Sequence, residues 1–235
     1  MFPFFGTPSI HMHILDRTMS RADLVELLGT SNGPIEFERC AFDGADLSDL
    51  TFRDCTFLRC SAAETSFRRA RLENSRWLGC KGRGIDFVTA QLTDARFKDS
   101  DFNNSSWARA KLASSMFDGV KLTGAVFTGI SALGLEFFDT LLVGADMSGV
   151  SFRKQRLVRL DFSGADLSGC DFRDTVFEGG SLREAHLANA KFEGADLRDA
   201  ELGTLRVRTA SSFKRATISH AQAALLANDL GITVA

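Results

Sequence analysis

Large hydrophobic side chains recur at every fifth position of this chain from Phe37 to Val207. Of the 35 positions in this series, 31 are Leu, Phe, Met or Trp, and the series contains 16 of the 21 phenylalanines. A period of five fits neither the 3.6-residue repeat of a helix nor the two-residue repeat of a flat strand. Each five-residue unit must therefore combine a short extended piece with a corner.

The residues around each central position indicate where the extended piece and the corner lie. Two positions before the centre, 27 of 35 residues are Ala, Cys, Ser, Thr, Val or Gly. Because strand side chains alternate between faces, this small residue and the large centre both point inward, and the residue between them points outward. Two positions after the centre, 23 of 34 residues are Gly, Asp or Asn, which tolerate tight turns and mark the corner.

Units such as Gly-Ala-Asp-Leu-Ser at 44–48 and 164–168 resemble those of the pentapeptide-repeat proteins, whose fold is a right-handed quadrilateral β-helix with four units per coil. The resemblance implies an all-β solenoid with a 20-residue coil. At about 4.8 Å per coil the units would build a rod about 40 Å long. One stacked column would contain Phe37, Phe57, Trp77, Phe97, Phe117, Phe137, Leu157, Phe177 and Leu197.

Two central positions hold small residues, Gly82 and Ala132. Each is followed by a larger inward residue, Ile85 and Leu135 respectively. Because protein interiors are close-packed, we expect these larger side chains to conserve the volume of the core.

Helix-capping patterns lie outside the repeats, where a solenoid needs to cover its raw strand edges. Ser20 and Asp23 resemble a capping box that begins a short helix, and Gly29 predicts its end. We divide the chain into an N-terminal segment with a capping helix (1–34), the β-helix (35–207) and a C-terminal helix plus strand (208–235).

The C-terminal segment has its own helix pattern. Ser219 and Gln222 predict a capping box, with Ile218 as the staple residue and Gly231 as the stop. The β-branched tail that follows, 232–234, predicts an exposed strand. Two roles remain open for this segment: self-association of two copies, or a plain cap on the last coil.

Composition and charge narrow the functional classes. The net charge of −2 excludes the strongly basic balance of proteins that bind nucleic-acid phosphates. No apolar run reaches the roughly 18 residues of a membrane helix, and residues 1–5 lack the basic start of a secretory signal. We therefore expect a cytoplasmic protein with neither a membrane nor a nucleic acid as its direct partner.

Catalytic and metal-binding patterns are absent from the sequence, so we expect neither an enzyme nor a cofactor. All five cysteines fall at the small inward position, where a buried thiol packs as a small hydrophobe; these are Cys40, Cys55, Cys60, Cys80 and Cys170. No histidine has a Cys or carboxylate at a convincing ligand spacing. The frequent Asp residues before the centres belong to the repeat and are expected to be solvated or turn-bonding.

Segments from both ends and the middle of the chain sharpen the family resemblance. The C-terminal strings 222–226 and 230–234, the segment Ser-Ala-Leu-Gly-Leu-Glu at 131–136 and the early units at 40–48 resemble segments of the Qnr-type, MfpA-like proteins that protect gyrase from quinolones or toxins. In that family two rods join through their C-termini into a dimer that mimics duplex DNA and occupies a type II topoisomerase. The resemblance thus implies a homodimer whose partner is DNA gyrase or another type II topoisomerase. It predicts dimer contacts at Ile218, Leu225, Leu226, Leu230, Ile232 and Val234.

Charge is distributed unevenly along the chain. Residues 160–205 contain 10 Asp or Glu and 4 Lys or Arg, whereas residues 53–121 contain 8 and 13. An acidic surface near the proposed joint would steer docking onto a positively charged partner. The predicted partner-binding residues are Asp161, Asp166, Asp171, Asp174, Asp196, Asp199 and Glu201.

The unbroken period of five separates this chain from Qnr proteins, whose loops interrupt the coil and contribute to protection. It is in this respect more similar to the loop-free gyrase-binding members. A basic cluster surrounds the unusual inward Gln155 and consists of Arg153, Lys154, Arg156 and Arg159. It is either a local contact site or a surface charge run. The alternative function for the whole chain is a generic protein-interaction scaffold with no topoisomerase role, because fold alone does not fix function.

Overall fold

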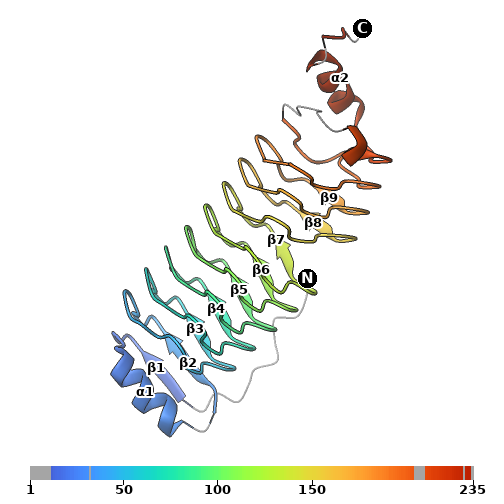
Figure 1. Cartoon of the computed structure of the whole chain (residues 1–235). Coiled ribbons are helices and arrows are strands. Elements are labelled where there is room, and N and C mark those ends of the chain that lie inside the picture. The colour runs from blue at the N-terminus through green and yellow to red at the C-terminus, as the bar shows by residue number, and fades with distance from the viewer. Residues whose placement is uncertain (1–11, 32, 204–209, 230, 234–235) are drawn as a thin grey trace.

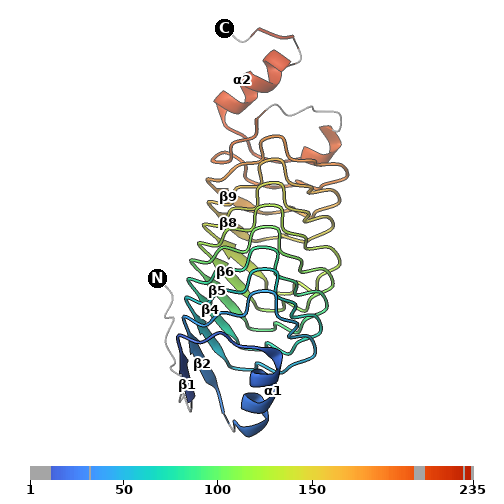
Figure 2. The same ribbon diagram turned by 90° about the vertical axis from the view of Figure 1, so that its left-hand side faces the viewer.

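The chain folds into a rod of stacked coils, with one helix at each end (Figure 1). This structure, a computed structural model, describes residues 12–31, 33–203, 210–229 and 231–233. Figure 2 shows the same coils after a quarter turn, stacked in order between α1 and α2.

In the described part of the chain, nine short parallel strands form a single sheet along one side of the rod, in the order β1 to β9. Their bounds are β1 Met12–Leu15, β2 Ile35–Glu38, β3 Thr56–Leu58, β4 Arg76–Leu78, β5 Arg96–Lys98, β6 Met116–Asp118, β7 Glu136–Phe138, β8 Arg156–Val158 and β9 Val176–Glu178. From β2 onward each residue pairs with the residue 20 positions later, as Phe37 does with Phe57. The predicted coil of four units is confirmed, and the coils wind right-handed, as crossovers between parallel strands do.

The sheet occupies one of four faces, which we call the strand face. The other three are held by isolated parallel bridges that join residues 20 apart, except that the second face begins with a bridge from Thr18 to Ala41, 23 residues apart. The bridges between residues 20 apart start at Ala41 (second face), Asp46 (third face) and Thr51 (fourth face). Figure 2 shows these faces as the regular bends of each coil.

Left-handed backbone conformation makes the corners. Every fifth residue from Arg39 to Gly194 has a positive φ, between 48° and 79°. At the corner after Phe42, the amide of Ala45 donates to the carbonyl of Phe42 at 3.0 Å and Gly44 has φ 68°, as in a type II turn. The enrichment of Gly, Asp and Asn at this position is thus explained, since these residues enter the left-handed region at least cost.

Stacked rings fill the interior, as the period predicted. Along the strand face, Phe57 lies 3.9 Å from Trp77 between ring centroids, and Phe97 lies 4.6 Å from Phe117, both pairs nearly parallel. The ring of Phe102 fills most of the space that a side chain at position 82 would occupy. Its Cδ1 lies 2.7 Å from the place of a Cβ on Gly82. Ile85 contributes as well, at 3.3 Å, so the expected compensation at Gly82 is confirmed.

Hydroxyls and thiols at the small inward position donate to carbonyls of the preceding coil. Thr65 Oγ1 donates to the Phe42 carbonyl at 2.8 Å, and Cys60 Sγ donates to the Phe37 carbonyl at 3.2 Å. Ser105 at the same position accepts from the buried Trp107 Nε1 at 2.7 Å. These inward hydroxyl, thiol and indole groups are thereby satisfied, as buried polar groups generally are.

The N-terminal end contains a strand that the sequence did not predict. β1 pairs with β2 at a separation of 23 residues, His13 opposite Glu36, and so extends the sheet before residue 35. Helix α1, Arg21–Thr30, follows with the expected capping box between Ser20 and Asp23. Gly29 is not the helix stop, because the helix continues through it to Thr30 and Ser31 is the C-cap.

At the C-terminal end the coil continues beyond the predicted boundary at residue 207, with one extra residue. Phe213 stacks on Phe192 at 4.9 Å and Thr217 pairs with Asp196, and both separations are 21 rather than 20. A 3-10 helix, Ala210–Phe213, lies in this last turn. Val207 itself lies outside the described residues.

Helix α2, His220–Asp229, then closes the rod. The predicted Ser219–Gln222 capping box is present, and the buried Gln222 amide also donates to the carbonyls of Leu197 and Ala200 at 2.8 and 2.7 Å. Gly231 ends the helix as predicted, with φ 76°. The predicted strand does not begin at Ile232, whose amide instead donates back to Ala227, and Val234 lies outside the described residues.

Candidate functional site

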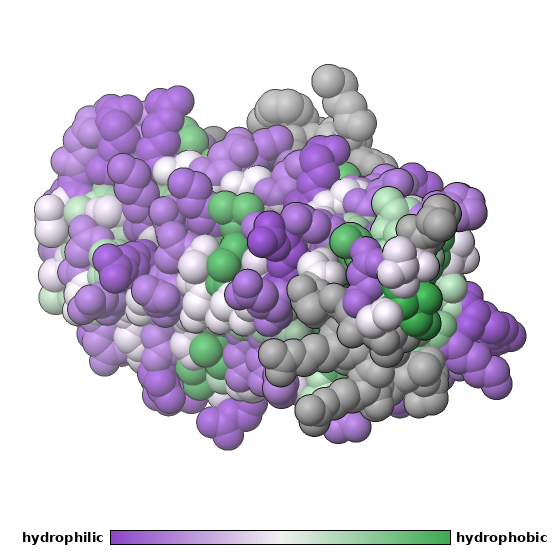
Figure 3. Space-filling view, turned by 90° about the horizontal axis from the view of Figure 1, so that it is seen from above, coloured by the Kyte–Doolittle hydropathy of each residue, from purple (hydrophilic) through white to green (hydrophobic). Residues whose placement is uncertain are grey.

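The seven acidic residues predicted to bind a partner lie on all four faces of the rod. Asp161 and Glu201 belong to the second face, Asp166 to the third, Asp171 to the fourth and Asp196 to the strand face. The other two, Asp174 and Asp199, occupy corner positions. Seen from above, hydrophilic side chains cover most of the visible surface and hydrophobic ones are scattered among them (Figure 3).

Four of these seven carboxylates form ion pairs. The partners are Arg173 for Asp171 (2.7 Å), Arg198 for Asp196 (2.6 Å), Arg183 for Glu201 (3.2 Å) and Arg153 for Asp174 (3.8 Å). Hydrogen bonding from Arg173 and Arg198 holds the pKa of Asp171 and Asp196 below the usual carboxyl value. The field that these residues project is therefore weaker than their number suggests.

The remaining three, Asp161, Asp166 and Asp199, form no ion pair within the described part of the chain. Asp161 and Asp166 share a further contact. Each accepts the amide of the serine two residues later, Ser163 or Ser168, at 2.9 Å. The Ser168 contacts hold the pKa of Asp166 below its usual value, so it stays ionised. Asp146 lies next to Asp166 on the third face, where a parallel backbone bridge joins the two residues. We call Asp146, Asp161 and Asp166, which lie on two adjoining faces, the acidic patch.

The six predicted dimer residues divide into three groups. Ile218 and Leu226 pack against the hydrophobic core of the rod. Leu225 and Ile232 are 58% and 56% exposed, and they offer apolar surface at the tip of the molecule. Leu230 and Val234 lie outside the described residues.

Carboxylates neutralise most of the basic cluster around Gln155. Arg159 pairs with Asp139, Arg156 with Glu178, and Arg153 with Asp174. Gln155 itself turns its amide to the Leu135 carbonyl at 3.2 Å. This pairing favours the surface charge run over the local contact site.

A surface hollow of about 600 Å³ lies beside this cluster and was not predicted. Its lining includes Ala132, Leu133 and Val150. Leu135 is buried as expected, yet Ala132 remains partly exposed and Leu133 is 84% exposed. The sequence feature that could have indicated the hollow is the small Ala132 at a central position, followed by the large apolar Leu133 at an outward position.

The cysteines behave as predicted, because all five are buried and unpaired thiols. Burial raises the pKa of Cys55 to about 11 and that of Cys170 to about 12, so these thiols remain protonated at neutral pH. Protonated thiols are poor nucleophiles and poor metal ligands, which leaves packing as their role.

No helix in the described part of the chain is long and apolar enough to cross a membrane.

Comparison with solved structures finds the same fold in proteins of known role. One trypsin-treated form of QnrB1, a plasmid-mediated fluoroquinolone resistance protein, has 25% sequence identity and a TM-score of 0.75, over 86% of this chain and all of that one. A second trypsin-treated form has 25% identity and a TM-score of 0.66 over 96% of this chain and 99% of that one.

A third structure, HetL from the cyanobacterium Nostoc sp. strain PCC 7120, is involved in heterocyst differentiation regulation. It has 16% identity and a TM-score of 0.53, over 81% of this chain and 87% of that one, and so is similar in fold alone. A search of curated protein sequences finds no match.

Two family models match almost the whole rod. The model for the pentapeptide repeat region matches residues 35–107, and the model for pentapeptide repeats matches 90–129, 136–174 and 170–203. These matches cover the coils whose period, corners and stacked core are described above. The chain belongs to the pentapeptide-repeat family and is Qnr-like in structure.

Proposed function

We propose that this protein binds a type II topoisomerase, DNA gyrase in the first instance, and protects it from quinolones or from a natural gyrase poison. The observation that supports this most strongly is the similarity to QnrB1, a fluoroquinolone resistance protein, over nearly the full length of both chains. The protein would act in the cytoplasm as a binding surface and not as an enzyme.

Charge supports docking through the coils near the C-terminus. The acidic patch holds carboxylates without ion pairs among the described residues, on a rod that lacks protruding loops from β2 to β9. Carboxylates on a narrow rod resemble the phosphates of duplex DNA in charge, so a positively charged DNA-binding groove would accept them.

The homodimer is part of the proposal and would form through the exposed apolar residues of the tip, Leu225 and Ile232. Deletion of residues 218–235 is a poor test of this, since it would also remove Gln222 and leave the carbonyls of Leu197 and Ala200 without their donor. Substitution of Leu225 and Ile232 leaves the hydrogen bonds from Gln222 to the last coil in place.

The test is DNA supercoiling by purified gyrase with ciprofloxacin, titrated with wild-type protein and two sets of variants. The Asp161→Asn/Asp166→Asn variant removes charge and keeps the acceptor oxygens for Ser163 and Ser168. Its matched control is Asp54→Asn, at an exposed corner in the basic half of the rod. Protection should weaken in the double variant and stay unchanged in the control.

The second set tests the joint. The Leu225→Glu/Ile232→Glu variant should become monomeric by analytical ultracentrifugation and lose protection. Ala223→Glu, exposed on another side of α2, should do neither. Equal protection by all variants would remove both the acidic patch and the joint from the proposal.

The alternative is a protein-interaction scaffold without a topoisomerase target. The ion pairing of Asp171, Asp174, Asp196 and Glu201 favours it, because paired carboxylates are weak substitutes for phosphates. HetL has the same fold and a regulatory role. Under this alternative, wild-type protein would neither protect nor inhibit gyrase.

A further inference from the structure

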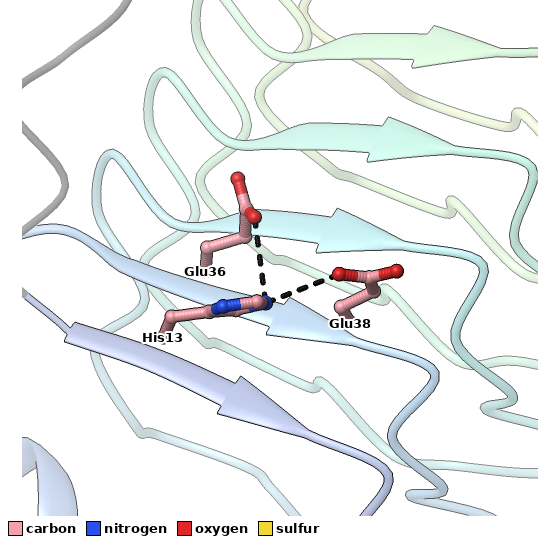
Figure 4. A group of neighbouring side chains, drawn as sticks. All are labelled: His13, Glu36 and Glu38. Carbon is pink, nitrogen blue, oxygen red and sulfur yellow. Dashed lines mark ion pairs between the residues drawn. The ribbon is translucent and has the colours of Figure 1, made fainter.

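At the N-terminal end of the rod, three potential metal ligands converge between the first two strands. Parallel pairing sets His13 of β1 directly opposite Glu36 of β2. Glu38 lies two residues further along β2, so its side chain is on the same face as Glu36. Figure 4 shows the imidazole between the two carboxylates. Sequence reasoning missed this group because it placed His13 in an irregular segment.

Distances within the group suit a small divalent ion. His13 Nε2 lies 3.6 Å from Glu36 Oε1 and 3.2 Å from Glu38 Oε2, and one ligand atom from each of the three residues lies within 4.8 Å of the others. In a tetrahedral zinc site with bonds of about 2.0–2.1 Å, neighbouring ligand atoms are about 3.3 Å apart. The two distances from His13 Nε2 are thus close to those of a zinc site, and the carboxylate oxygens of Glu36 and Glu38 lie within 4.8 Å of each other.

Charge around the group also favours a cation. The Glu36 and Glu38 side chains are only 21% and 18% exposed, so both carboxylates are largely withdrawn from water. Three carboxylates, those of Glu36, Glu38 and Asp16, face one guanidinium, that of Arg39, and one imidazole, that of His13. Partly buried carboxylates that converge in this way are stabilised by a counter-ion, and a dication supplies more charge than a protonated imidazole does.

Neighbouring side chains orient one of the ligands. Arg39 Nη1 donates to Glu38 Oε1 at 2.5 Å, which leaves Oε2 facing His13. Arg39 is itself held by both oxygens of Asp16, at 2.7 Å each. Outer contacts of this kind fix the orientation of metal-binding carboxylates.

We propose that His13, Glu36 and Glu38 form a binding site for a divalent transition metal of the Zn²⁺ class. An imidazole nitrogen combined with carboxylate oxygens suits such ions better than Mg²⁺ or Ca²⁺, which prefer oxygen ligands alone. The bound ion links β1 to β2 and so fastens the strand at the edge of the sheet, where no further strand precedes it among the described residues. Its role is structural, at the N-terminal end of the rod and away from the acidic patch.

The test uses the full chain, stripped of metal by a chelator and titrated with ZnCl₂ in competition with a chromophoric chelator. One Zn²⁺ per chain is expected. His13→Ala should lower the affinity at least about tenfold, and Glu36→Gln and Glu38→Gln should act in the same direction. The matched control is His186→Ala, on the third face, which should bind as the wild type does.

Hydrogen exchange supplies a second measurement that does not depend on affinity. Zn²⁺ should slow exchange of the β1–β2 amides and leave those of β8 and β9 unchanged, and His13→Ala should abolish the effect. Absence of Zn²⁺ binding, or binding that survives all three substitutions, would overturn the proposal and identify the group as an ion-pair cluster only. Binding of Mg²⁺ with the same affinity as Zn²⁺ would also overturn the proposal.

Discussion

Replacement of Phe137 by Ala tests whether the alternation of inward and outward residues builds this fold. Phe137 and Phe138 are adjacent in β7, yet Phe137 is 2% exposed in the core and Phe138 faces outward and is partly exposed. The Phe137 ring lies 5.0 Å from Phe117, 5.9 Å from Phe127 and 6.3 Å from Phe152 between centroids. The same substitution at the two positions therefore removes the same atoms from two different environments.

The expected loss at Phe137 is about 4 kcal/mol of the free energy of unfolding. Buried Phe→Ala changes cost about 3–5 kcal/mol, and the three ring contacts place this site in the upper part of that range. Phe138→Ala should cost about 1 kcal/mol, since partly exposed positions contribute less. Total stabilities of domains are about 5–15 kcal/mol, so only the first change removes a large share.

Urea unfolding, followed by far-UV circular dichroism and by tryptophan fluorescence, measures both losses. Trp107 is a suitable reporter, because its ring lies 5.2 Å from Phe117 and 5.6 Å from Phe127. The urea midpoint should fall for Phe137→Ala while the slope stays unchanged. Equal losses for the two variants, or a larger loss for Phe138→Ala, would refute the assignment of inward and outward positions.

Three further predictions concern glycines with positive φ, the carboxylates and the thiols. Gly180→Ala should destabilise the folded protein by more than about 3 kcal/mol in urea unfolding, because the added Cβ would lie 2.2 Å from the Leu160 carbonyl oxygen. Gly144→Ala, which has open space and a similar positive φ, should cost about 1–2 kcal/mol. Hydrogen bonds hold the pKa of Asp46, Asp166, Asp171 and Asp196 below the ordinary value of 3.8 in the folded protein. In acid the unfolded chain therefore binds more protons than the folded protein does. The urea midpoint should be steady from pH 7 to about 5 and fall as the pH drops further. All five buried cysteines should be inert to a thiol reagent at neutral pH in the folded protein and react fully in denaturant; rapid reaction of the folded chain would contradict their packing role.

The repeat itself could be predicted from the sequence because it is local and periodic. Central positions, small inward positions and corners all recur every five residues, and the structure places a left-handed corner even at Arg39, Thr89 and Lys154. The same repetition made Cys60 and Cys80 predictable as core residues, since each occupies a position that Ala fills elsewhere.

Irregular features could not be predicted, because they depend on contacts between distant residues. β1 lies outside the period and finds its place only through pairing with β2. The extra residue in the last turn appears in the structure as the stacking of Phe213 on Phe192. No property of the sequence around Ile232 distinguished a strand from the end of a helix.

The acidic surface was predicted from counts along the chain, and counts do not show pairing. Glu201 meets Arg183 across stacked coils, 18 residues apart in sequence, and Asp171 meets Arg173 within one unit. Among the described residues, the carboxylates of Asp161 and Asp166 accept hydrogen bonds from serines, a difference from the paired carboxylates that no composition window reveals. The structure thus reduces the candidate surface from seven residues to a smaller patch.

The most direct test of the proposed function is supercoiling by purified gyrase poisoned with ciprofloxacin or with a peptide-type poison, in the presence of increasing amounts of this protein. Restored supercoiling with wild-type protein is expected, with protection reduced by Asp161→Asn/Asp166→Asn and retained by Asp54→Asn. Neither protection nor inhibition at micromolar protein would contradict a topoisomerase role and favour the interaction scaffold.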